Sequence, residues 1–167
     1  MMDETRLSDA VAKHRTMVFR LAYSYTGSCE DAEDISQDVF LKLYQSNKRF
    51  NDDEHMKAWL LRVTVNAAKA LLRSSWRKRR ADLLCDDVPC YQDAANRELF
   101  DCVMRLAPKY KAVIYMYYYE DYPVKEIARI MKISETAVTT RLGRGREQLK
   151  RTYSTADLKK EETLYES

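Results

Sequence analysis

Glycine and proline are so rare in this chain that they restrict its fold more than any other feature of the sequence. Only three residues of each type occur among 167, and these are the residues on which tight turns between strands depend. Apolar residues recur every three or four positions along most of the chain, which is the period of an amphipathic helix. We therefore predict an all-α protein.

Three long helices are predicted in the first half of the chain. The apolar pattern places them at about residues 4–25, 29–46 and 54–76. Gly27 separates the first two, and Ser28 is a typical N-cap residue with Asp31 three positions after it. Residues 47–54 are polar and prone to turn, apart from Phe50.

A change of composition at residues 82–93 separates the two halves, because this stretch holds four aspartates, Pro89 and no basic residue. Four shorter helices are expected after it, at about residues 94–106, 108–120, 124–131 and 135–153. We predict two small helical domains joined by a flexible acidic linker. The first spans residues 1–80, the linker 81–93 and the second domain 94–153, followed by a polar tail at 154–167.

The composition also excludes several classes of protein. The four cysteines form no CxxC pair and lie far from the two histidines, so no metal site or cofactor is predicted. They are interpreted as free thiols, with a redox role left open for Cys85 and Cys90 in the linker. No apolar run approaches the roughly 18 residues that span a bilayer, and the N-terminus lacks the features of a signal peptide. We expect a cytoplasmic protein without membrane insertion.

Residues 124–138 fit a helix-turn-helix. Ile127 and Met131 are expected in the core, Ser134 is expected to cap the second helix, and Lys132 occupies a position where glycine often adopts a left-handed conformation. The outward face of the second helix carries hydroxyl and guanidinium side chains, which bind base edges and phosphates. These residues are Thr136, Thr139, Thr140, Arg141, Arg144 and Arg146. The face favours DNA binding, and a merely solvated basic face is the alternative.

The N-terminal half segregates charges of opposite sign. Residues 29–41 hold five acidic residues and no basic one. Acids in a first helical turn complement the helix dipole, but Asp38 lies two turns further on. Since an acidic surface repels DNA, we interpret it as a protein-binding surface.

Residues 62–80 hold seven basic residues and no acidic one, with Asn66 in the middle of the helix. Positive charge follows phosphates, and a positioned amide can hold an unstacked base. We expect this helix to bind nucleic acid. Trp59 fits the core better than a base contact, and a solvated C-terminal cap is the alternative for residues 77–80.

Three segments resemble those of the sigma-70 family. Residues 31–40, Asp-Ala-Glu-Asp-Ile-Ser-Gln-Asp-Val-Phe, resemble its polymerase-binding helix. Residues 58–69, Ala-Trp-Leu-Leu-Arg-Val-Thr-Val-Asn-Ala-Ala-Lys, resemble its promoter −10 helix, and residues 106–149 resemble its −35-binding domain. The resemblance covers about residues 10–152 in the expected order. The absence of further domains points to the extracytoplasmic-function (ECF) group.

The resemblance implies a role for each matched residue. Contacts with the coiled coil of the polymerase β′ subunit are implied for Asp31, Asp34, Gln37, Asp38 and Leu41. Contacts with the melted −10 strand are implied for Phe50, Lys57, Arg62, Asn66, Lys69, Arg73 and Arg77, with a flipped base held by the loop at residues 50–57. Contacts with the −35 duplex are implied for Thr136, Thr139, Thr140, Arg141, Gly143, Arg144 and Arg146. Gly143 departs from the larger side chain usual in the family.

The resemblance further implies a transcription initiation factor rather than an enzyme. Its partners are core RNA polymerase, promoter DNA and an anti-sigma factor, which is often membrane-bound. Two rivals remain from the residues alone. A conventional helix-turn-helix regulator explains the second half equally well but leaves the acidic and basic helices unexplained. The second rival, a sigma-sequestering or scaffold protein with no role on DNA, does not account for the basic face.

Overall fold

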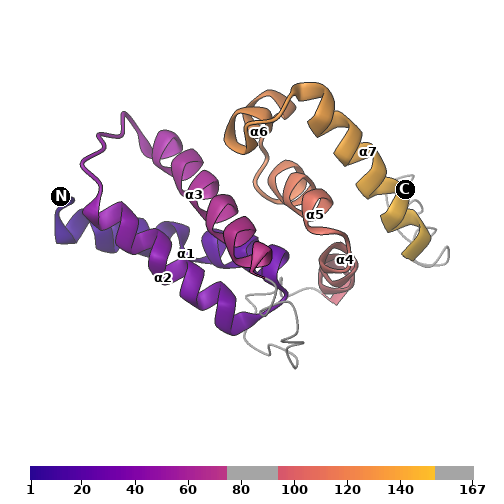
Figure 1. The fold of residues 1–167 in the computed structure, drawn as a ribbon, viewed down its shortest axis with the longest axis horizontal. Coiled ribbons are helices and arrows are strands. Elements are labelled where there is room, and N and C mark those ends of the chain that lie inside the picture. The colour runs from indigo at the N-terminus through magenta and orange to yellow at the C-terminus, as the bar shows by residue number, and fades with distance from the viewer. Residues whose placement is uncertain (75–93, 153–167) are drawn as a thin grey trace. The chain divides into compact units, whose positions relative to one another are not determined.

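The computed structural model describes residues 1–74 and 94–152, with side chains from Leu99 onward in the second stretch. All regular structure in these two stretches is helical (Figure 1), which confirms the all-α prediction. The chain divides into two compact units, Met1–Pro89 and Cys90–Ser167. The expected linker and tail lie outside the described residues.

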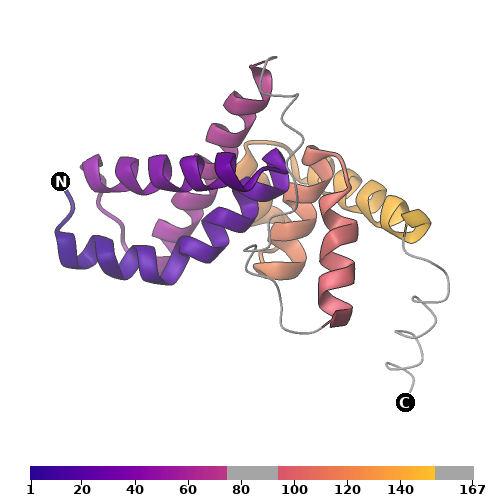
Figure 2. The same ribbon diagram turned by 90° about the horizontal axis from the view of Figure 1, so that it is seen from below.

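Over residues 1–74, the first unit consists of α1 (Glu4–Thr26), α2 (Cys29–Gln45) and α3 (Asp53–Arg73) (Figures 1 and 2). Gly27 ends α1 in the left-handed conformation at φ 63°, which glycine adopts without steric cost. Ser28 caps α2 as predicted, since its Oγ accepts a hydrogen bond from the Asp31 backbone N–H at 3.1 Å. The fully buried side chains at the centre are Val18, Leu21, Ala22, Ala32, Val39, Leu43, Leu60, Leu61 and Ala68.

The second unit contains α4 (Ala94–Met104), α5 (Pro108–Ile114), η2 (Tyr115–Tyr119), α6 (Val124–Met131) and α7 (Glu135–Thr152). Pro108 occupies the start of α5, where its missing N–H costs nothing. The predicted helix at residues 108–120 changes to a π-helical turn at η2. Asp121 then takes a positive φ of 56°. Neither the π-helical turn nor this backbone conformation was predicted.

The helix-turn-helix is present as predicted. Lys132 ends α6 in the left-handed conformation at φ 54°, and the Ile133 backbone N–H donates to the Ala128 carbonyl at 3.1 Å. The Ser134 Oγ accepts a hydrogen bond from the Ala137 backbone N–H at 3.0 Å, so it caps α7. Ile127 is fully buried on α6. These contacts fix the direction in which α7 presents its outer face.

Candidate polymerase and nucleic-acid interfaces

The outer side of α2 carries four of the five residues expected to bind polymerase. They form a surface that we name the α2 face: Asp34, Gln37, Asp38 and Leu41, all exposed. Their spacing of three and four residues places them on one side of the helix. The other side is anchored in the core by Ala32, Val39 and Leu43. Leu41 is 51% exposed, so the α2 face combines negative charge with one apolar side chain.

Asp31 differs from these four residues, because it is only 5% exposed. It lies in the first turn of α2, where its backbone N–H is capped by Ser28. The expectation that Asp31 faces a partner therefore disagrees with its burial. Its neighbour Glu30 is exposed.

An aromatic cluster shapes the loop that precedes α3. The Phe50 ring meets the rings of His55 and Trp59 edge-on, with centroids 5.4 Å and 5.7 Å away. Phe50 itself is 8% exposed, so it packs inside the loop and does not point into solvent. Trp59 is half-buried and does not belong to the buried core, so the interpretation of Trp59 as a core residue is not confirmed.

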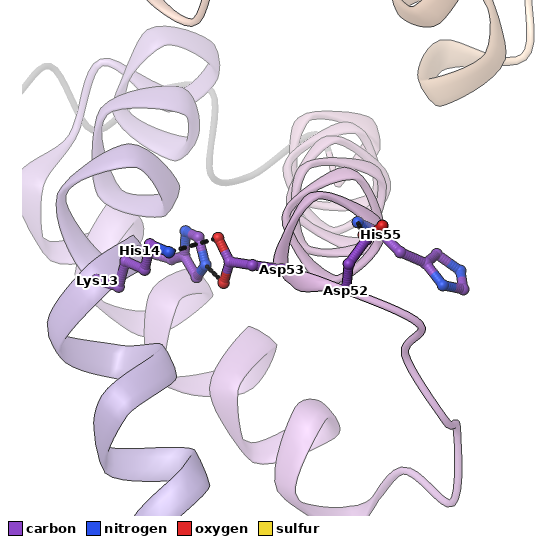
Figure 3. Close-up of polar contacts among 5 residues, drawn as sticks. All are labelled: Lys13, His14, Asp52, Asp53 and His55. Carbon is purple, nitrogen blue, oxygen red and sulfur yellow. Dashed lines mark hydrogen bonds and ion pairs between the residues drawn. The ribbon is translucent and has the colours of Figure 1, made fainter.

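Polar contacts fasten the start of α3 to α1 (Figure 3). Asp53 accepts from Lys13 Nζ at 2.7 Å and lies 3.0 Å from His14 Nε2. The hydrogen bond from Lys13 holds the pKa of Asp53 below its usual value. Asp52 caps α3, because its Oδ1 accepts from the His55 backbone N–H at 2.7 Å. His55 points away from the Asp53 cluster (Figure 3). The end of the loop that leads into α3 is thus held by both contacts.

A polar stripe runs along α3 beyond this loop. Arg62, Asn66, Lys69 and Arg73 follow one another at three- and four-residue spacing, which places them on one side of the helix. Asn66 and Arg73 are exposed, and Arg62, Lys69 and Lys57 are half-buried. The structure brings these predicted −10 residues together on one helix. The remaining one, Arg77, lies outside the described residues.

The outer side of α7 presents most of the residues expected to bind the −35 duplex. Thr136, Thr139, Thr140 and Arg144 are exposed, and Arg141 and Gly143 are half-buried at its flanks. Opposite them, Val138 and Leu142 are buried at 0% and 2% exposure. We name the exposed residues Thr136, Thr139, Thr140, Arg144 and the adjoining Gly143 the α7 face. Side chains of this kind bind phosphates and base edges.

Arg146 is exposed as well, but it is engaged within the protein. Its Nε donates to the Tyr118 hydroxyl at 2.6 Å. Its guanidinium lies over the rings of Tyr117 and Tyr118, 5.7 Å and 5.6 Å from their centroids. The two tyrosines were not among the predicted site residues. A run of three tyrosines in the sequence was the available signal.

Gly145 allows α5 and α7 to approach closely. A Cβ atom at this position would lie 3.1 Å from Ile114 Cγ1 and 3.2 Å from Cδ1, whereas a Cβ at Gly143 would meet nothing within 4 Å. Lys111 on α5 is 8% exposed, and burial lowers its pKa from 10.5 to about 8. The second unit therefore buries a lysine on α5, the same helix that α7 approaches closely at Gly145.

The thiols are not alike. Cys102 is buried and forms no disulfide bond, as predicted, whereas Cys29 is disulfide-bonded, so the interpretation of Cys29 as a thiol outside a disulfide was wrong. Cys85 and Cys90 lie outside the described residues. Within residues 1–74 and 94–152, no three His, Cys, Asp or Glu side chains are placed to hold a metal ion. No helix in those stretches has the length and apolar character to cross a membrane.

Comparison with known proteins identifies both units. The family model for Sigma-70 region 2 matches residues 10–78, and that for Sigma-70, region 4 matches residues 96–149. The RNA polymerase sigma factor SigV of Bacillus subtilis (strain 168) is 30% identical over 144 residues, covering 83% of this chain and 85% of that protein. The ECF RNA polymerase sigma factor SigW of the same strain is 26% identical over 171 residues, covering 89% of each.

Two solved structures share the fold. CnrH, in complex with the cytosolic domain of CnrY, is 24% identical with a TM-score of 0.64, covering 90% of this chain and 88% of CnrH. The sigma factor RpoE from Bartonella quintana, in complex with the anti-sigma factor NepR, is 16% identical with a TM-score of 0.66, covering 86% and 94%. The two units are thus a sigma region 2 domain and a sigma region 4 domain. The chain belongs to the ECF group of the sigma-70 family of RNA polymerase sigma factors.

Proposed function

We propose that this sigma factor directs promoter-specific initiation by dividing three tasks among three helices. The α2 face binds the coiled coil of the polymerase β′ subunit. The stripe on α3 and the loop before it capture the melted −10 strand. The α7 face reads the −35 duplex. The assignment places the first two tasks in residues 1–80 and the third in residues 94–153, with residues 81–93 as linker.

The opposite character of the α2 and α7 faces carries this proposal. An exposed acidic face cannot approach phosphates without repulsion, while it suits a basic protein surface. A face of threonines with one arginine suits a major groove. A conventional helix-turn-helix regulator needs only the second of these faces, so the α2 face favours the sigma assignment.

Strand opening then requires binding energy but no catalysis. Bases that leave the stack are held by the N-terminal unit, and capture is worth a few kcal/mol per base, comparable with the unstacking cost. Asn66 is exposed in the middle of the α3 stripe, where its amide is available to such a base. Phe50, being buried, contributes by supporting the loop. We propose a binding protein that is not an enzyme and needs no cofactor.

The partners and location follow from the same surfaces. We propose that an anti-sigma factor covers them until a signal releases the protein, as the CnrH and RpoE complexes suggest by analogy of fold. The protein then acts in the cytoplasm, where promoter DNA and polymerase are found, and the anti-sigma factor can hold it at the membrane. Co-purification from native cells tests this partner directly.

In vitro transcription tests the function. Purified core polymerase is assayed on genomic fragments with and without the protein, and run-off transcripts are mapped to their start sites. We expect defined starts that depend on this protein. An absence of promoter-specific initiation on every fragment would contradict the proposal. DNA binding without any stimulation of polymerase would favour the conventional regulator.

A further inference from the structure

An aromatic and cationic cluster on the second unit lies beside the α7 face. We name it the Tyr118 cradle: Tyr117, Tyr118 and Arg146. The two tyrosine rings meet edge to face with centroids 5.0 Å apart. Arg146 lies over both rings and donates from Nε to the Tyr118 hydroxyl at 2.6 Å. Tyr118 is 50% exposed, so the cradle is open to solvent.

The backbone around the cradle is fixed by packing. Gly145 lets α7 approach Ile114, the last residue of α5, before the chain continues into η2. Tyr115 donates to Glu120 at 2.8 Å and stacks on Tyr119, with centroids 5.6 Å apart. Both ends of η2 are thereby held. Tyr118 is consequently presented to Arg146 by rigid elements.

This arrangement leaves most of the Arg146 guanidinium available. Its Nε–H is used by Tyr118, and its plane is oriented by two rings, while the other N–H groups remain for a ligand. Among the residues that the structure describes, no carboxylate pairs with Arg146. A guanidinium held in this way suits a phosphate group, whose oxygens accept two of its N–H donors.

The position of Arg146 on α7 indicates which part of the DNA duplex it can contact. Thr139 and Arg146 are seven residues apart, so they lie on nearly the same side of α7 and about 10 Å apart along it. A major groove is about 12 Å wide. If Thr139 faces base edges in the groove, Arg146 lies where the helix passes the sugar–phosphate backbone.

We propose that Tyr118 is a positioning residue that holds Arg146 as a clamp for one backbone phosphate of the −35 duplex. The inference rests on the proposed −35 binding by α7. Under this proposal, Arg146 raises the affinity for every DNA sequence and does not discriminate between sequences. Tyr118 contributes through Arg146 and does not itself need to contact DNA.

The test measures binding of the full chain to a −35 duplex and to a scrambled duplex, over a range of salt concentrations. Arg146→Ala is expected to weaken both complexes equally, by roughly three- to tenfold, and to reduce the salt slope by about one. Tyr118→Phe removes the hydrogen bond and keeps the ring. It is expected to weaken both complexes by roughly two- to fivefold while the salt slope stays the same.

The double variant and a matched control complete the design. Tyr118→Phe is expected to add nothing once Arg146 is Ala, because its effect acts through that side chain. Tyr117→Phe removes the neighbouring hydroxyl, for which no hydrogen bond exists among the described residues, and is expected to change nothing.

Three outcomes would overturn the inference. They are an unchanged affinity in Tyr118→Phe, additive losses in the double variant, or a loss in Arg146→Ala confined to the −35 sequence. Arg144→Ala separates these outcomes from failure of the proposed function. If Arg144→Ala also leaves −35 binding unchanged, the placement of the α7 face on DNA is wrong.

Discussion

The α2 face and the α7 face are built alike and differ in chemistry. Each is the exposed side of a helix whose opposite side packs into the core. Val39 on that side of α2 and Val138 on that side of α7 are fully buried. One presents carboxylates with an exposed leucine, and the other presents three threonines and one arginine. In both helices, packing decides only which side is exposed. Charge then decides which partner can approach it.

Reversing one charge on the α2 face should have the largest effect. Asp38→Arg puts a cation where a basic partner is expected, so the affinity for core polymerase should fall by about 3 kcal/mol or more, on the order of 100-fold. The affinity for −35 DNA should not change. Pull-down or fluorescence binding with core polymerase measures the first quantity, and anisotropy with labelled duplex measures the second.

Asp9→Arg is the matched control for this variant. It makes the same charge change at an exposed position on α1, away from the α2 face, and should leave polymerase binding intact. If Asp38→Arg retains wild-type affinity for core polymerase, the assignment of the α2 face is refuted. Equal losses in both variants would indicate a general electrostatic effect.

Removing one guanidinium from the α7 face should have the next largest effect. Arg144→Ala should weaken −35 binding by about 1–3 kcal/mol and relax specificity at one base pair, if Arg144 reads a base. Competition binding against single-base variants of the duplex measures both effects. Arg105→Ala, at an exposed arginine beyond the end of α4, serves as the control. A loss that is equal on all sequences would make Arg144 a phosphate contact.

The α2 and α7 faces also show what the sequence can predict. The structure confirms the features that follow from local patterns. These are the helix starts to within one residue, the caps at Ser28 and Ser134, and the left-handed Lys132. These features depend on neighbours within four residues, so the sequence contains all the information they need.

Features that depend on distant contacts were missed. The burial of Asp31 depends on how α2 packs, and the pairing of Arg146 with Tyr118 joins residues 28 apart. The π-helical turn falls in a run in which every residue is aromatic or Met, so the apolar period cannot show which side is buried. Local propensity carries no information about such contacts.

The two units differ in their buried polar groups as well. In the first, buried Thr64 and Ser36 donate to carbonyls one turn earlier, at 2.7 Å and 2.8 Å. In the second, Lys111 is buried, and no hydrogen bond or ion pair is found for its side-chain ammonium group among the described residues. Burial lowers its pKa to about 8. Keeping the charged ammonium in the folded state therefore lowers the free energy of unfolding.

Replacing that lysine should therefore stabilise the second unit. Lys111→Met is expected to raise the free energy of unfolding by about 1–2 kcal/mol at pH 7. The unfolded state binds more protons between pH 8 and 10.5, so wild-type stability rises through that window and the difference shrinks. Denaturant titrations at pH 7 and pH 10 measure this. Lys109→Met, an exposed position on the same helix, should give no gain, and an equal gain would contradict the desolvation argument.

A pair of glycines in α7 provides a smaller test of the same unit. Gly143→Ala is expected to stabilise the protein by about 1 kcal/mol, because alanine favours a helix and its Cβ meets nothing. Gly145→Ala should gain less, since Ile114 must move to make room. Thermal unfolding compares the two variants. If Gly145→Ala is the more stable variant, α5 and α7 have room for a Cβ atom at Gly145, and their packing there does not fix the position of the Tyr118 cradle.

Breaking the ion pair that fastens α3 to α1 is expected to have the smallest effect on stability. The Asp53 carboxylate is bound by Lys13 and lies against His14, and its pKa is lowered. A lowered pKa means that the pair stabilises the protein above the ordinary value of 3.8 and that this contribution is lost as the pH falls below it. Since Asp53 is exposed, the contribution at pH 7 should stay below about 1 kcal/mol.

Asp53→Asn should therefore lower stability slightly at pH 7 and converge on the wild type near pH 3, as measured by denaturant titration at both values. Asp52→Asn is its control, because it removes the same charge one residue earlier while asparagine keeps the helix cap. If both variants lose equally, the effect belongs to the helix dipole of α3 and the contact with α1 adds nothing. If only Asp53→Asn loses stability, the start of α3 is held by its contact with α1, and the α3 residues that we propose to capture the −10 strand depend on that contact for their position.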